Sequence, residues 1–346
     1  MMQLNKYELN ILSSFSKIDI NDISPLKFNS IEGVINFKKD EYLDAYDSFI
    51  ENKFLVGEGD NVTVANELES AFLIIHQPEV VVSFKRISQL DIKNEIFCFK
   101  KGFGLQYSIN NDSTIHNLIY PHVLPSVGLW IRNNIFINNE FEEEKLSRFT
   151  TNVTLAETVV LNVIMSILKD RVELKKEKLT YDETVIKLDD LKKYDNYTDI
   201  GRFTAQYMNK EKMKLYMENN KNVDKSIESL VKKGFIEFDN NKIVLTIFAK
   251  QILDPGKILD SIVVTESTLD ISKISTINVK TNGYIVITTD TLNTESISYK
   301  FEVFPHTVDI QDLIKGVCPN AFKDGFGNEL LYKKKLEESK QKNTFN

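Results

Sequence analysis

The sequence has few of the residues that form cross-links, metal sites and reactive centres. Its 346 residues include two cysteines, one tryptophan and four histidines. Two cysteines, Cys98 and Cys318, cannot form a disulfide framework, so we expect a reducing compartment. No histidine occurs at a Cys/His or His-x-x-x-His spacing, so no metal site is predicted. The four are His76, His116, His122 and His306.

Long apolar runs are also missing. The longest, residues 159–168, contains Asn162 and Ser166 and is far shorter than the ~20 residues needed to cross a bilayer. The first six residues are not followed by the apolar core of a signal peptide. We therefore expect a cytoplasmic protein with no membrane partner.

Motifs of known catalytic chemistry are absent as well. There is no Gly-x-Ser-x-Gly nucleophile elbow and no recognisable Cys/His couple. Two Gly-Phe-Gly sequences, at 102–104 and 325–327, lack the Gly-Lys-Ser/Thr of a phosphate-binding loop and are predicted to be turns. Carboxylates are abundant, but nothing singles out a general acid/base pair. We predict a protein that is not an enzyme, with no catalytic residue and no cofactor.

The charge is acidic and unevenly distributed. The net charge is −7, yet residues 333–346 carry five lysines and two glutamates, so the rest of the chain is at −10. An acidic body repels phosphate backbones, which weighs against nucleic-acid binding. The hydrophobic share of 42% is ordinary for a folded protein.

One spacing recurs along the chain. Four matched pairs lie 181 positions apart, and the tripeptides Tyr120-Pro121-His122 and Phe304-Pro305-His306 lie 184 apart. A constant spacing over many positions indicates an internal duplication, with chance similarity between two Ile/Asn/Lys-rich segments as the alternative. His122 and His306 would then be equivalent, in a structural turn or in a paired pH-sensitive or ligand site. The four pairs are Phe54/Phe235, Val62/Ile243, Ile96/Ile277 and Gly102/Gly283.

Each half predicts a helix followed by a short hairpin, which is the pattern of a winged helix. In the first half the helix covers residues 40–53 and the hairpin residues 54–64. In the second half these are 226–233 and 235–245. Asn66 and Thr246 are predicted to cap the helices that follow.

A meander of four strands is predicted after each winged element. The predicted fold class is therefore α+β, with two quasi-symmetric repeats whose meanders join in a central antiparallel sheet flanked by helical bundles. Joining the meanders would hide strand edges that each one alone would expose. The predicted repeats are residues 1–150 and 151–332, the second with a charged insertion at 171–197, and 333–346 form a polar tail. The insertion is predicted to be an exposed helix with i,i+4 ion pairs or a mobile loop.

The order of elements resembles the EspG family of chaperones in type VII (ESX) secretion. The resemblance rests on a first helix at 7–18, a helix ending in Asn52-Lys53-Phe54-Leu55, and the strand start at 78–82 before the meander. It implies two quasi-symmetric halves that share a central sheet. It also implies a cytosolic protein that holds the helical tip of a secreted substrate pair and keeps it soluble until export.

The function predicted from these patterns is non-enzymatic binding of a helical protein partner, as a chaperone or adaptor. The candidate contacts are the turn Lys101, Gly102, Phe103 and Gly104, the insertion with Tyr197, and Trp130. Trp130, the single tryptophan, is either a core residue or an interface anchor. The alternative is a tandem winged-helix DNA-binding protein that regulates replication or transcription. The acidic helix at 40–53 favours protein over DNA as the partner.

Overall fold

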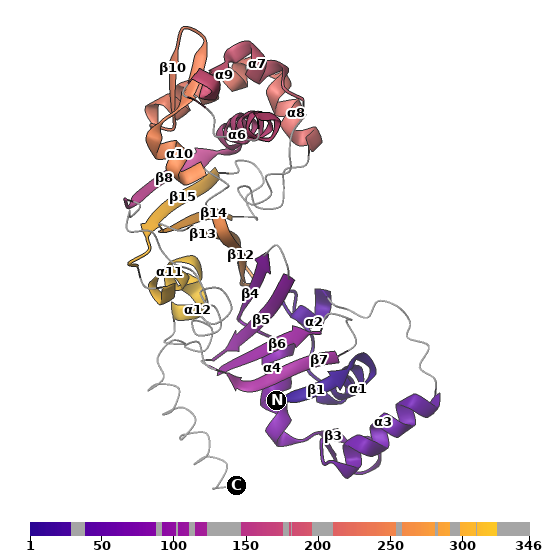
Figure 1. Cartoon of the computed structure of the whole chain (residues 1–346). Helices are drawn as coiled ribbons and strands as arrows, with labels where there is room; N and C mark the ends of the chain where they lie inside the picture. Colours follow the sequence, from indigo (N-terminus) through magenta and orange to yellow (C-terminus); the bar gives the residue numbers. More distant parts are fainter. Residues whose placement is uncertain are drawn as a thin grey trace. The chain divides into compact units, whose positions relative to one another are not determined.

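The computed structural model describes residues 1–28, 39–87, 92–101, 103–110, 115–122, 147–175, 180, 182–195, 210–253, 258–280, 283–290, 298–308 and 310–323. These residues form an α+β fold with a large antiparallel sheet and several helices (Figure 1). The α+β class and the antiparallel sheet predicted from the sequence are therefore confirmed.

The large sheet has ten strands among the described residues. All eight strand runs predicted for the two meanders are present, and two short strands, β1 and β8, were missed by the sequence analysis. The order across the sheet is β1 (Met2–Asn5), β7 (Ile115–His122), β6 (Phe103–Ile109), β5 (Ile92–Lys100), β4 (Val80–Ile87), β12 (Ile258–Ser267), β13 (Ser272–Lys280), β14 (Gly283–Asp290), β15 (Ser298–Pro305) and β8 (Phe149–Thr154).

The chain divides into two compact units. Unit 1 comprises Met1–Ile137, Val264–Ser272 and Ile310–Asn346. Unit 2 comprises Asn138–Val263 and Lys273–Asp309. Neither unit is one continuous stretch of sequence.

Unit 1 packs its helices on a core centred on Leu12, Phe72 and Ile75. α1 begins with a capping box, in which Asn5 accepts from the backbone of Tyr7 and Glu8 while Glu8 bonds back to the Asn5 N–H. The described helices of this unit are α1 (Lys6–Ser16), α2 (Pro25–Phe28), α3 (Lys39–Glu51), α4 (Asn66–His76), α11 (Ile310–Val317) and α12 (Pro319–Lys323). The short pair β2 (Leu55–Val56) and β3 (Thr63–Val64) follows α3.

A buried carboxylate holds α12 within unit 1. Glu266 of β12 accepts hydrogen bonds from the backbone N–H of Ala321 at 2.9 Å and from Asn320 Nδ2 at 3.0 Å. Buried charged groups are tolerated when they are fully hydrogen-bonded. This attachment makes residues 310–323 part of the unit that begins at the N-terminus.

Unit 2 is built around α6 (Leu155–Lys175). Every residue from Glu157 to Ile167 is buried, so the helix is enclosed on all sides over three turns. Its described neighbours are β8, α7 (Leu188–Lys193), α8 (Lys210–Glu218) and α9 (Asn220–Lys232). α10 (Ile247–Leu253) completes the described helices of this unit.

The segment predicted as a charged insertion belongs to the fold. Its described part contains the short strand β9 (Ile186–Lys187) and α7, and it buries Ile186 and Leu191. β9 pairs with β11 (Lys242–Leu245), which also pairs with β10 (Ile236–Asp239). The prediction of an exposed helix or mobile loop was wrong for these residues, because two apolar side chains among many charges are enough to anchor the strand and the helix.

Phe235 ties this small sheet to the large one. Its buried ring lies 6.3 Å from the ring of Phe149 in β8, 6.0 Å from Phe248 in α10 and 6.3 Å from Phe301 in β15. Aromatic pairs at these separations add to the free energy gained by burial. The helix–hairpin segment Asn220–Leu245, called the α9 element below, is therefore fixed on the strands of unit 2.

Of the two predicted helix caps, one is confirmed and the other is wrong. Thr246 caps α10, since its Oγ1 accepts from the Ala249 N–H at 3.0 Å. The prediction for Asn66 was wrong, because α4 begins at that residue and its N-cap is Ala65, which has no side chain to bond the first turn.

Exchanging these caps tests how much each one stabilises its unit. We expect Thr246→Ala to lower the free energy of unfolding by about 1 kcal/mol, because it removes a cap, and Ala65→Thr to raise it by a similar amount. Urea unfolding followed by circular dichroism measures both. An unchanged midpoint in both variants would contradict the assignment.

Candidate protein-binding surfaces

The predicted contact residues lie partly in one tight turn. Lys101 is exposed between β5 and β6 with a φ of 49°, and its N–H donates to Glu79 Oε2 at 2.9 Å. Phe103 is half-buried against the core of unit 1, and Gly104 is buried opposite Phe99. Of these three, only Lys101 offers an exposed side chain. Gly102, Trp130 and Tyr197 lie outside the described residues.

The α9 element presents a surface that local sequence patterns did not define. Along α9 the exposed charges alternate in sign, with three lysines and two carboxylates, and Asp224 is paired with Lys192 at 2.8 Å. The hairpin that follows exposes Glu237, Asp239 and Lys242, and the side chain of Phe238 is 40% exposed. The α9 charges are Lys221, Asp224, Lys225, Glu228 and Lys232.

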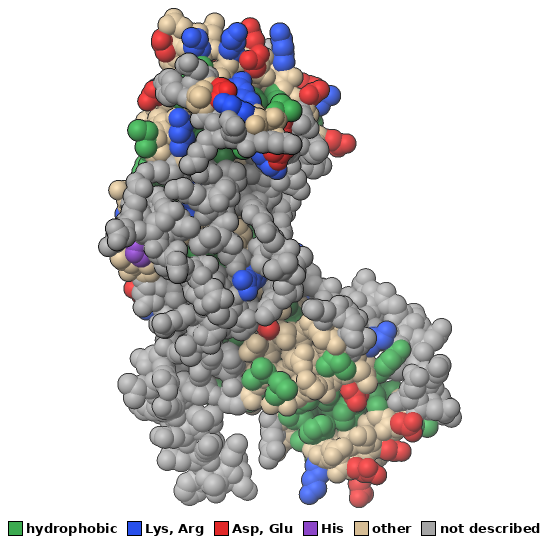
Figure 2. Space-filling model, viewed as in Figure 1, with side chains coloured by type: hydrophobic (Ala, Val, Ile, Leu, Met, Phe, Trp, Pro, Cys, Tyr) green, Lys and Arg blue, Asp and Glu red, His purple; other side chains and the backbone are tan. Residues whose placement is uncertain are grey.

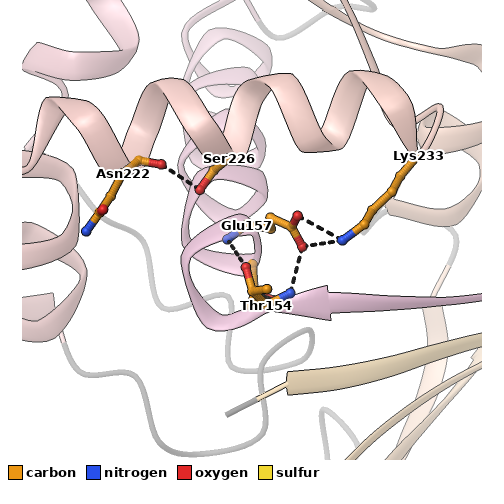
Figure 3. A network of polar contacts seen from close by, with 6 residues as sticks. Thr154, Glu157, Asn222, Ser226 and Lys233 are labelled. Atoms are coloured by element: carbon orange, nitrogen blue, oxygen red, sulfur yellow. Dashed lines mark hydrogen bonds and ion pairs between the residues drawn. The ribbon is translucent and has the colours of Figure 1, made fainter. Parts of the chain in front are cut away.

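A buried ion pair fixes α9 on α6. Lys233 Nζ lies 2.8 and 2.6 Å from the two carboxylate oxygens of Glu157, as Figure 3 shows. The Thr154 N–H donates to Glu157 Oε2 at 2.6 Å, and the Glu157 N–H donates to Thr154 Oγ1 at 3.2 Å. This reciprocal pair is a capping box at the start of α6. One carboxylate therefore caps α6 and holds the end of α9.

The Glu157 carboxyl is ionised at neutral pH, so it cannot act there as a general acid. Burial raises the pKa of this carboxyl, but the hydrogen bonds from Lys233, Ser229 and the Thr154 backbone outweigh burial, so the pKa lies below its ordinary value. The side chain is 3% exposed and remains ionised. We assign it to structure.

A narrow, partly open pocket lies between the helices, with mostly apolar walls and no space for a water molecule. Ser226 contributes one polar group, but its hydroxyl already donates to the Asn222 carbonyl at 2.8 Å (Figure 3). The lining residues are Ala156, Val159, Val160, Tyr216, Met217, Asn222, Val223 and Ser226. The pocket offers apolar contact and no reactive group.

A serine–histidine pair in unit 1 was missed by the sequence analysis. His76 Nδ1 donates to the Ile18 carbonyl at 2.8 Å, so Nε2 accepts from the Ser13 hydroxyl at 3.0 Å. The spacing is that of a nucleophile and its base. The imidazole, however, is 1% exposed and lies edge-on to the Phe72 ring. The pair therefore joins α1 to α4 and has no open face for a substrate.

Other classes of site find no support in the described part of the chain. No group of three or more His, Cys, Asp or Glu side chains there could hold a metal ion. None of the helices described is both long enough and apolar enough to span a membrane.

Breaking the buried ion pair should loosen α9. We expect Lys233→Met to lower the free energy of unfolding by about 2 kcal/mol, because it leaves the buried Glu157 carboxylate without its cation. Urea unfolding measures the loss. In the double variant Glu157→Gln/Lys233→Met the loss should be smaller than the sum of the two single losses. Additive losses would show that the pair does not act as a unit.

Acid should destabilise unit 1 through its buried histidines. Burial lowers the pKa of His76, despite the bond to Ile18, and also lowers the pKa of His116, which lies 2.9 Å from the Tyr107 hydroxyl. Their contribution to stability is present above the unfolded pKa of about 6.5 and is lost as pH falls through the lower folded values.

The free energy of unfolding should therefore decrease as the pH is lowered from about 7 to about 5. The fall should be shallower in the variant His76→Gln/His116→Gln. An equal slope in this variant would assign the pH dependence to other groups.

Comparisons with known proteins assign no family. No protein-family model matches the chain, and no curated protein matches it. The functional argument therefore rests on the surfaces described above.

Proposed function

We propose that the protein is a non-enzymatic cytoplasmic chaperone or adaptor that holds a helical protein partner. The observation that carries this proposal is the surface of the α9 element. It combines an exposed aromatic ring, Phe238, with carboxylates at Glu237 and Asp239 on the same hairpin. Aromatic side chains are favoured in protein interfaces, whereas carboxylates are repelled by nucleic-acid phosphates.

Main-chain geometry supports an internal duplication, which would give the protein two such elements. Five hydrogen bonds of the helix–hairpin segment occur twice, at positions 181 apart, and Lys53 and Gly234, also 181 apart, both have positive φ. The repeated register Leu55↔Val64 and Ile236↔Leu245 agrees with this spacing. The bonds, from N–H to carbonyl, are 52→48 and 233→229, 53→50 and 234→231, 54→49 and 235→230, 65→54 and 246→235, and 69→65 and 250→246.

Strand order also supports two quasi-symmetric repeats. Read from either end, the large sheet has one short strand, then four strands that are consecutive along the chain. This arrangement resembles that of EspG-type chaperones, with two halves that share a central sheet. On that resemblance the partner is a helical secretion substrate of the type VII kind.

A second candidate, tandem winged-helix DNA binding, is favoured by one specific observation. The small sheet has the order β10-β11-β9, with one strand contributed from before the helix α9 and a hairpin after it. That order is found in winged helices. The three lysines exposed on α9 are the groups that would contact phosphates.

A pull-down of the tagged full-length protein from its native cells separates the two candidates. We expect a helical protein to remain bound at near-equal stoichiometry after washing at moderate salt, because apolar contacts are not screened. Mass spectrometry identifies it. The matched variant Phe238→Ser should retain less of it.

A measurement of duplex DNA binding at low salt tests the DNA-binding candidate. A steep loss of binding with added salt would favour the DNA-binding candidate, since each phosphate contact releases counterions. Repeated recovery of no protein partner would contradict the chaperone proposal.

A further inference from the structure

One side of α3 in unit 1, next to its buried face, carries two exposed aliphatic side chains in a line. Leu43 and Ile50 are 44% and 37% exposed and lie seven residues, or two turns, apart on one side of the helix. Single exposed aliphatic residues are common, but an aligned pair on a helix forms a stripe that another helix can contact.

The face of α3 that borders the stripe, about a quarter turn round the helix, is occupied by the core of unit 1. Phe49 is buried there, and Tyr42, Ala45 and Tyr46 are packed against the same core. The Tyr46 ring lies 5.6 Å from that of Phe15 in α1. The stripe therefore lies at the edge of the buried face, where Leu43 and Ile50 remain exposed to solvent.

Carboxylates lie on the solvent side of α3 and in the turn between β2 and β3. From Tyr42 to Asn61 the chain carries five acidic side chains and one basic side chain, Lys53. Within the described part of the chain none of the five forms an ion pair. Figure 2 shows acidic side chains gathered at the end of unit 1 where Figure 1 draws α3 and β3. The five are Asp44, Asp47, Glu51, Glu58 and Asp60.

This charge restricts what can bind. A second copy of the chain would place like charges against one another, which is costly at an interface. Nucleic acid is repelled for the same reason. A partner with lysine or arginine side chains flanking an apolar stripe would be complementary to both the apolar stripe and the negative charge of α3.

We infer that the side of α3 defined by Leu43 and Ile50 is the docking site for a basic amphipathic helix of the partner protein. The inference rests on the proposed function and names the chemistry of the partner. Leucine-like side chains of the partner helix contact Leu43 and Ile50, and its cations lie against Asp47 and Glu51. This is helix recognition through an apolar stripe, with charges that set its orientation.

A designed peptide tests the surface directly. The probe is a helix of about 18 residues, or five turns, with leucines on one face and lysines flanking them. Its comparison peptide has glutamates in place of the lysines. We expect the full-length protein to bind the lysine peptide in a salt-dependent manner and to bind the glutamate peptide far more weakly. Fluorescence anisotropy of labelled peptides measures both.

Substitutions locate the binding. Leu43→Ser/Ile50→Ser should weaken binding of the lysine peptide about tenfold or more, and Asp47→Lys/Glu51→Lys should also remove its salt dependence. The matched control is Leu215→Ser/Ile247→Ser in unit 2, which alters residues that are 67% and 78% exposed and should leave binding unchanged. Urea midpoints equal to that of the unaltered protein confirm that each variant folds.

Two results would overturn the inference. One is unchanged peptide binding by the Leu43→Ser/Ile50→Ser variant, and the other is equal weakening by the control in unit 2. A pull-down of the native partner distinguishes failure of this inference from failure of the proposed function. If the α3 variant still retains the partner in a pull-down, only the docking site is wrong. If no partner is recovered but the peptide binds through α3, only the proposed function is wrong.

Discussion

The packing of Phe235 is the interaction on which unit 2 depends. Its backbone N–H bonds to the end of α9, its carbonyl accepts from Thr246 at the start of α10, and its ring lies among aromatic rings from β8, α10 and β15. One residue thus joins a helix, a hairpin and the large sheet. Because the interior around it is close-packed, the exposed face of α9 is held in a fixed orientation. A binding surface fixed in this way loses little conformational entropy when a partner binds.

Charge and exposure act together around two exposed side chains, Ile50 and Phe238. The charges next to these two in the chain are carboxylates, whereas α9 itself carries three exposed lysines and two carboxylates. Exposed apolar groups without charge would favour self-association, and like charges oppose it. Carboxylates at these positions would be complementary to a basic surface.

Much of the fold could be predicted because strands and hairpins leave local signals. Alternating apolar residues located both meanders, and the turns at 57–61 and 239–241 located the two hairpins. Local pattern could not show that α6 is enclosed on all sides, since enclosure depends on neighbours that come from elsewhere in the chain. Nor could it show β9 and α7, where charged residues hide the two side chains that anchor them.

The polar contacts of the candidate sites could not be predicted from the sequence, because their partners lie far apart along the chain. Glu157 and Lys233 are separated by 76 positions, and Ser13 and His76 by 63. Only folding brings these pairs together, and a single sequence contains no signal at such distances. The Thr154-x-x-Glu157 spacing of a capping box is a local pattern that could have pointed to Glu157, but the sequence analysis did not use it.

The division of the chain has a consequence for biosynthesis. Unit 1 combines residues 1–137 with Glu266 and the helix at 319–323, which a ribosome makes more than a hundred residues later. Unit 2 is complete once residue 309 has emerged. During translation residues 1–137 therefore cannot complete unit 1 until residues 319–323 have been made. The nascent segment 1–137 is then a species on which ribosome-associated chaperones would act.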